Sequence, residues 1–162
     1  MLWDPPNRSS MWRFGYKTPK NYIDNQNFCG GYKVQYNING GKCGICGDDY
    51  RKPRPRANEN HGKLGLGIIT RKYYEGFNVG VIVKITASHL GKFIFSLCNL
   101  DREKETEECF KRNPLRLANG SDSFQVTEYK NKNYWIYLKL PQGLTCKHCV
   151  LRWHYVAGKS YY

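Results

Sequence analysis

The sequence predicts an all-β protein, an antiparallel β-sandwich of the immunoglobulin or fibronectin III type with long loops and disulfides. Short stretches alternate apolar and polar residues at a period of two, and glycine- or proline-rich turns separate them. Hardly any segment shows the longer period of a helix, and the chain has seven cysteines among its 162 residues. No repeat or linker divides the chain, so we expect one domain over residues 1–162.

The elements can be placed in chain order. Residues 1–30 are rich in proline, asparagine and aromatic residues, which predicts a long ordered loop with one short helical turn. The acidic segment 101–109 is expected to form a charged loop with a single turn of helix. Strands are predicted at 31–38, 64–69, 79–85, 93–98, 124–129, 134–140 and 149–156. In the last strand, Cys149, Leu151, Trp153 and Tyr155 form the better core face.

One histidine stands out by its position. His89 lies on the connection between two strongly apolar strands, in the segment 87–92. A histidine at the end of a rigid sheet can serve as a metal ligand or a general base. The alternative is an ordinary hydrogen-bonded loop histidine, which the stretch alone favours, and a lone histidine is not a metal site.

The cysteines indicate disulfides and an oxidising compartment. A bridge from Cys98 to Cys109 would close the acidic segment. The two Cys-x-x-Cys pairs also permit a zinc site, but about a hundred residues separate them, which favours disulfides. Asn7 and Asn119 begin glycosylation motifs, which weakly support secretion. The disulfide candidates are Cys29, Cys43, Cys46, Cys98, Cys109, Cys146 and Cys149.

The net charge does not identify one class of binding partner. There are 26 basic and 13 acidic residues, a net charge of +13, and the basic residues are scattered. This allows binding to nucleic acid or to other anionic surfaces, although a solvated basic surface is the simpler interpretation. A basic nucleic-acid-binding protein with structural zinc is therefore one alternative. No apolar run of membrane-spanning length is present.

Several longer motifs then show a family resemblance. The chain resembles the copper-dependent lytic polysaccharide monooxygenases of auxiliary-activity family fifteen, which are found mainly in arthropods and other invertebrates. The resemblance extends nearly from end to end. The motifs are WDPPNRSSMWR at 3–13, NYxDN at 21–25, FCGG at 28–31, GKCGICGD at 41–48, TASH at 86–89 and LPxGLTCxxCVLRW at 140–153.

The resemblance implies a fibronectin-like sandwich and a histidine brace. In that brace the N-terminal histidine binds one copper ion through its amine and imidazole, and a second histidine supplies another nitrogen. His89 matches the second histidine, and Ala87 matches the small residue that crowds the axial position. Aromatic residues of the first loop would contribute to a flat substrate surface, namely Trp3, Trp12, Tyr16 and Tyr22.

The implied function is oxidative cleavage of glycosidic bonds in crystalline chitin or cellulose, at C1 or C4. It needs one copper ion, an external electron donor, and O2 or H2O2 as co-substrate. The resemblance implies a secreted, extracellular monomer whose partner is the polysaccharide, with no nucleic-acid or membrane partner. The alternative within the same fold is a non-catalytic polysaccharide-binding module.

Two departures concern the ends of the sequence. The family commonly has His-Gly directly before a segment like that beginning at Met1, and it continues after a segment like that ending at Tyr162. That continuation carries further cysteines and a strand with the axial aromatic residue. We therefore expect the domain to be incomplete at both ends, and the chain as written to bind copper weakly with little oxidative activity.

Overall fold

The computed structural model describes residues 1–158 as seven strands and three short helices. Most of the regular structure is β, and the helices each span no more than six residues. No helix of this described part is long and apolar enough to cross a membrane. The elements are β1 (Leu2–Asp4), η1 (Met11–Phe14), η2 (Lys33–Ile38), β2 (Asn78–Lys84), β3 (Gly91–Asn99), α1 (Glu107–Arg112), β4 (Pro114–Leu117), β5 (Phe124–Val126), β6 (Asn133–Lys139) and β7 (Cys149–Ala157).

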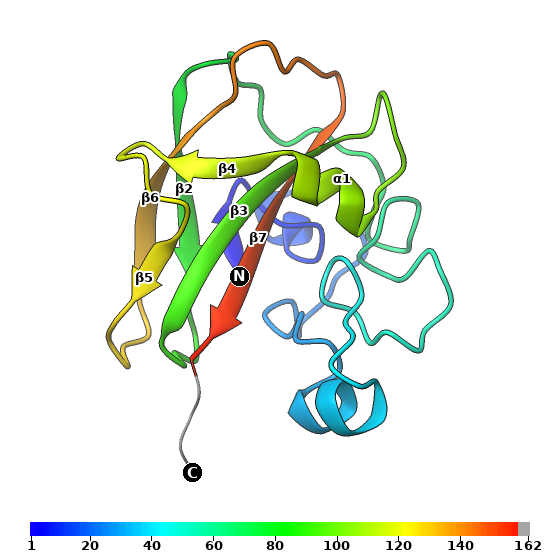
Figure 1. Cartoon of the computed structure of the whole chain (residues 1–162). Helices are drawn as coiled ribbons and strands as arrows, with labels where there is room; N and C mark the ends of the chain where they lie inside the picture. The colour runs from blue at the N-terminus through cyan, green and yellow to red at the C-terminus, as the bar shows by residue number, and fades with distance from the viewer. Residues whose placement is uncertain (159–162) are drawn as a thin grey trace. The chain divides into compact units, whose positions relative to one another are not determined.

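All strand pairs are antiparallel. The strands follow the order β1-β2-β6-β4-β3-β5, and β7 pairs with β3. β4 pairs with β6 on one side and with β3 on the other, so it joins the layer of β2 and β6 to the layer of β3 and β7 (Figure 1). The result is a nearly barrel-like antiparallel β structure. This confirms the predicted class, whereas the immunoglobulin or fibronectin III assignment stays a prediction.

The core of these strands follows from their alternating sequence. On β6, Tyr134, Ile136 and Leu138 are buried, while Trp135 and Tyr137 between them are exposed. β2 buries every second residue in the same way, and β3 is buried along most of its length. Apolar side chains that alternate on paired strands gather on one face, which is why the two layers pack together.

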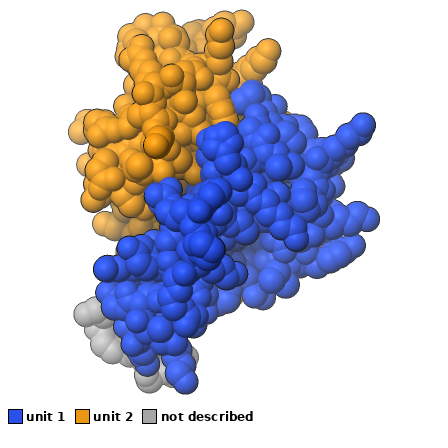
Figure 2. Space-filling view, turned by 90° about the vertical axis from the view of Figure 1, so that its right-hand side faces the viewer, with its two compact units in different colours: residues 1, 6–69 blue, residues 2–5, 70–162 orange. Residues whose placement is uncertain are grey.

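The chain divides into two compact units (Figure 2). Unit 1 comprises residues 1 and 6–69, and unit 2 comprises residues 2–5 and 70–162. All seven described strands and α1 belong to unit 2, while η1 and η2 belong to unit 1. The expectation of a single domain over 1–162 stays a prediction.

Unit 1 is stabilised by a disulfide and by buried polar contacts. Cys29 is bonded to Cys43. Glu59 is fully buried, and its carboxylate accepts hydrogen bonds from Arg54 at 2.8 Å and from Arg56 at 2.6 Å. Burial raises the pKa of Glu59, but the hydrogen bonds from the two arginines outweigh it, so the pKa lies below its ordinary value.

Two strand predictions in unit 1 are wrong. Residues 31–38 do not form a strand: Lys33–Ile38 is a π-helix whose side chains are all at least partly exposed. Residues 64–69 contain only an isolated bridge, between Asn60 and Gly65. In both segments the alternating pattern has no neighbouring strand to pair with. The backbone groups are instead satisfied locally, as where the N–H of Asn39 donates to the carbonyl of Val34.

The predictions for unit 2 fare better. β2, β3, β6 and β7 lie where the alternation places them, whereas β5 is shorter than the predicted 124–129. The sequence did not indicate β1 or β4, which have three and four residues. The helical turn of the acidic segment is α1, which starts after Thr106, whose hydroxyl accepts from the N–H of Cys109.

Three disulfides join six of the seven cysteines, all of which lie in the described residues. The predicted bridge between Cys98 and Cys109 is confirmed, and it ties α1 to the end of β3. Cys146 is bonded to Cys149, and Cys46 takes part in no disulfide. The zinc alternative is therefore wrong, because three of its four cysteines are bonded to other cysteines within this structure.

Gly91 offers a direct test of how tightly β3 and β7 approach each other. Its φ is 94°, and a Cβ atom there would overlap the carbonyl oxygen of Val156 on β7. We expect Gly91→Ala to lower the free energy of unfolding by about 3 kcal/mol or more, since strain adds to a backbone clash. Gly120→Ala is the matched control: its φ is 88°, nothing lies within 4 Å, and only the strain of about 1–2 kcal/mol applies. Equal losses in urea unfolding would contradict the close approach.

Candidate functional site

The connection between β2 and β3, residues 85–90, is held in place by backbone-directed hydrogen bonds. The N–H of Ile85 donates to the carbonyl of Lys132, and the N–H of Ser88 donates to Oδ1 of Asn131 at 3.1 Å. The hydroxyl of Ser88 donates to the carbonyl of Glu128 at 2.8 Å. The connection is thus fixed to the loop that precedes β6.

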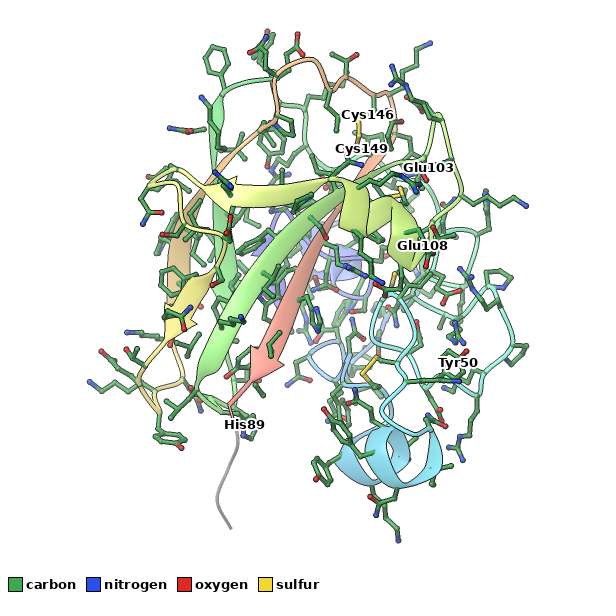
Figure 3. The ribbon with its side chains drawn as sticks, viewed as in Figure 1. Tyr50, His89, Glu103, Glu108, Cys146 and Cys149 are labelled. Carbon is green, nitrogen blue, oxygen red and sulfur yellow. A yellow bond between two sulfur atoms is a disulfide. The ribbon has the colours of Figure 1, made fainter. Side chains whose placement is uncertain are left out.

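The backbone of His89 is fixed from the other side by β7. Its N–H donates to the hydroxyl of Tyr155 at 2.9 Å, and its carbonyl accepts from the N–H of Gly158 at 3.0 Å. His89 itself is exposed, at the end of β3 and β7 (Figure 3). A fixed backbone with a solvent-facing imidazole suits metal binding, because the ligand is positioned before the metal arrives.

Tyr155 is held by the aromatic core of unit 2. Its ring lies 5.0 Å from the ring centroid of Phe93, edge to face, and 6.0 Å from that of Trp153. Burial raises the pKa of Tyr155, although the hydrogen bonds from His89 and Ser88 act in the opposite direction. Its hydroxyl therefore stays protonated through neutral pH, and it remains a fixed polar group beneath His89.

The start of β1 lies at the same end of the sheet as His89. Leu2 is opposite Val83 and Asp4 is opposite Ile82, in antiparallel register. β2 runs toward Lys84 and then enters the connection that carries His89, so β1 begins where β2 ends. A group joined to the chain upstream of β1 is therefore delivered to the His89 end of the sheet.

The other residues predicted for the site fall in both units. Ala87 is exposed on the same connection, two positions before His89. Trp3 lies on β1, and Nζ of Lys84 sits 4.6 Å above its ring centroid. Trp12, Tyr16 and Tyr22 belong to unit 1, where the rings of Trp12 and Tyr22 pack edge to face at 5.0 Å. The roles of all these residues remain predictions.

His148 lies far from His89 within unit 2. It is part of the Cys146–Cys149 loop, which leads into β7. Asn99 is opposite Cys149 and Gly91 is opposite Ala157, so this loop is at the end of the β3–β7 pair that is distant from His89. Figure 3 shows the Cys146–Cys149 bridge and His89 at opposite ends of this strand pair. Among residues 1–158, no three histidine, cysteine, aspartate or glutamate side chains are grouped so that they could hold a metal ion.

The two glycosylation motifs differ in their surroundings. Asn119 is exposed in a turn, where its Oδ1 accepts from the N–H of Ser121. Asn7 is half-buried, and its Oδ1 accepts from both the N–H and the hydroxyl of Ser9, which is fully buried. Both sites stay predictions, and Asn119 is the more accessible of the two.

Tyr155 is the site residue that the sequence did not reveal. Alternation placed it on the core face of the last strand, and the structure agrees, since it packs on the core. That its hydroxyl reaches the backbone of His89, 66 positions away, depends on the register of β7 against β3. Local sequence patterns carry no information on that register.

The family comparison covers the whole chain. Residues 1–162 match the family model described as lytic polysaccharide mono-oxygenase, cellulose-degrading. The chain belongs to this family. Lytic polysaccharide mono-oxygenases are copper enzymes that act oxidatively on polysaccharides, so the chain is placed among monooxygenases that use copper. No curated protein matches the chain.

A solved structure of such a mono-oxygenase agrees closely. The chain is similar to the lytic polysaccharide monooxygenase AA15 from Thermobia domestica in the Cu(I) state, with 47% sequence identity and a TM-score of 0.95. The match covers 99% of this chain and 84% of the Thermobia chain. The resemblance to auxiliary-activity family fifteen is thereby confirmed.

The described residues fit part of a copper site. The imidazole of His89 offers one nitrogen donor, of the type that copper prefers, on a backbone held at two points. Because β1 begins at the same end of the sheet, a residue joined before β1 would bring any nitrogen donor it carries to this end.

The link from Tyr155 to His89 can be tested by removing one hydroxyl. We expect Tyr155→Phe to speed amide hydrogen exchange at His89 about tenfold and to cost about 1 kcal/mol of stability, because the His89 N–H loses its acceptor. Tyr129→Phe, which removes a hydroxyl from an exposed tyrosine, is the control and should leave exchange at His89 unchanged. Unaltered exchange in Tyr155→Phe, measured by nuclear magnetic resonance, would show that this hydrogen bond does not hold the site.

Proposed function

We propose that the protein is a secreted copper monooxygenase that cleaves glycosidic bonds in crystalline chitin or cellulose by oxidation at C1 or C4. The observation that carries this proposal is the exposed, backbone-anchored His89 at the sheet end where β1 begins. Membership of the mono-oxygenase family supports it, and the family description names cellulose as a substrate. A monomer with a polysaccharide partner fits the proposal.

In this proposal His89 is one nitrogen ligand of a single copper ion. An N-terminal histidine would supply the amine and a second imidazole, and the small side chain of Ala87 would lie close beside the metal and crowd it. When bound, copper supplies one-electron redox chemistry, with an external electron donor and with O2 or H2O2 as co-substrate.

The protein's own residues position the site and the polymer. Tyr155 and Gly158 hold the backbone of His89, and the hydrogen bonds of Ser88 hold the connection. Indole and phenol rings present flat apolar faces with polar edges, which suits stacking on sugar rings. We assign this role to the aromatic residues Trp3, Trp12, Tyr16 and Tyr22.

Copper binding tests the ligand assignment. In a chain carrying His-Gly directly before Met1, we expect His89→Gln to weaken Cu(II) binding by about 100-fold or more, since it removes one of three nitrogen donors. His154→Gln, at an exposed position on β7, is the matched control and should bind as the parent does. Without the added His-Gly, the parent chain should bind more weakly in the same calorimetric titration. Equal affinity of the His89 and His154 variants would overturn the assignment.

Product analysis tests the reaction. With copper and ascorbate, we expect the chain carrying His-Gly to release oxidised oligosaccharides from β-chitin or crystalline cellulose, identified by mass spectrometry as aldonic acids or C4 ketones. The His89→Gln variant should release none. Binding to both polymers without any oxidised product, in a chain that binds copper tightly, would instead show a non-catalytic binding module.

A further inference from the structure

A second surface of unit 2 lies on the outward side of the β2–β6 pair. We call it the aromatic face, and define it by the outward residues of β2 and β6 together with Arg116 of β4. Trp135 and Tyr137 are its two large side chains, with 70% and 62% of their surface exposed. The other members are Asn78, Gly80, Ile82, Lys84, Asn133 and Lys139.

The register arranges these residues as a straight stripe. Across the two strands, Ile82 is opposite Trp135 and Gly80 is opposite Tyr137. The outermost rows each contain a lysine: Lys84 is opposite Asn133 at one end of the stripe, and Lys139 is opposite Asn78 at the other. Rows of same-facing residues are about 7 Å apart along a strand, so the stripe is roughly 20 Å long. Two aromatic rings therefore lie between two amines.

The rings stand on a rigid support. β6 pairs with β2 along its whole length, and at its other edge β4 pairs with its last two residues, Leu138 and Lys139. The N–H of Ala118 also donates to the carbonyl of Tyr137. The pairing with β2 restricts the backbone at both rings, and the contacts with β4 and Ala118 restrict it further at Tyr137, so a ligand would meet rings that are already in place.

Gly80 shapes the surface around Tyr137. A Cβ atom at position 80 would lie 3.4 Å from Cε1 of Tyr137, so the phenol ring leans over the bare backbone of Gly80. With one side of the ring against the strand, the opposite side faces solvent. This leaves a flat aromatic platform of the kind that stacks on planar or ring-shaped ligands.

The charge of the aromatic face is one-sided. The outward positions of β2 and β6 carry Lys84 and Lys139 and no acidic residue, and Arg116 adds a third positive charge on β4. On the neighbouring strand β1, Asp4 is opposite Ile82, and its carboxylate pairs with Arg71 at 2.6 Å. Nζ of Lys139 donates to the carbonyl of Gly76, and Arg116 pairs with Asp122 at 3.1 Å, both of them highly exposed. Asp122 and Asp4 are each matched by an arginine, so Lys84 and Lys139 leave the face with a net positive charge that attracts anions.

We propose that the aromatic face binds an acidic polysaccharide chain, one that carries carboxylate or sulfate groups. The rings of Trp135 and Tyr137 stack on sugar rings, and Lys84 and Lys139 pair with the acidic groups. The choice of a sugar polymer rests on the proposed function, whereas the preference for an anion rests on the face itself. This surface would bind without copper, and its side chains are distinct from His89.

Two cellulose derivatives test this proposal, because they share a backbone and differ in charge. In affinity electrophoresis of the copper-free chain, we expect carboxymethyl cellulose to retard the protein much more than hydroxyethyl cellulose does. The double variant Trp135→Ala/Tyr137→Ala should bind the carboxymethyl polymer about tenfold more weakly. Lys84→Gln/Lys139→Gln should weaken binding and make it less dependent on salt.

Tyr32→Ala is the matched control, since Tyr32 is 77% exposed and lies on η2 in unit 1. It should leave the retardation unchanged, and thermal melts should show that all variants are folded. Full retention of binding in Trp135→Ala/Tyr137→Ala would overturn the proposal, as would equal binding of both polymers. Tighter binding of single-stranded DNA than of carboxymethyl cellulose, through the same two rings, would also overturn it. Because no copper is present, none of these outcomes bears on the role of His89.

Discussion

The pairing of β3 with β7 is the constraint on which the candidate site depends. The two strands pair over nine positions, from Gly91 opposite Ala157 to Asn99 opposite Cys149. This register brings the hydroxyl of Tyr155 under the N–H of His89 and the N–H of Gly158 to its carbonyl. A shift by one residue would turn Tyr155 to the opposite face of the strand, and the histidine would lose its anchor.

The two units reach stability by different physical means. Unit 2 buries alternating apolar residues between paired strands, and a cluster of rings around Phe93 fills the space near the site. Unit 1 has little regular structure, and it relies on the Cys29–Cys43 bridge and on buried ion pairs such as Arg56 with Glu59. Short-range order in unit 1 therefore comes from hydrogen bonds and covalent bonds rather than from a sheet.

The sequence predicts the elements whose position depends on local alternation, and it does not predict contacts that depend on the pairing of distant strands. Alternation located β2, β3 and β6, because each of them buries every second residue or more. It also located β7, whose Leu151, Trp153 and Tyr155 are partly buried and pack against the core. The same pattern failed at Lys33–Ile38, where no strand is present to pair with. The family motifs singled out His89, while its tether to Tyr155 required the pairing of distant strands. Predicting the aromatic face also required the register, because only the pairing of β2 with β6 places Trp135 and Tyr137 beside Gly80 and between the two lysines.

The buried carboxylate of Glu59 gives unit 1 a sensitivity to acid that the apolar core of unit 2 lacks. Because the pKa of Glu59 is lowered in the folded chain, its ionised form stabilises the fold above the ordinary pKa of a glutamate. This contribution is lost as the pH falls through the folded value, when protonation breaks the pairs with Arg54 and Arg56. Acidification should therefore loosen the helical and loop segments of unit 1 while the strands of unit 2, with His89 at their end, stay assembled.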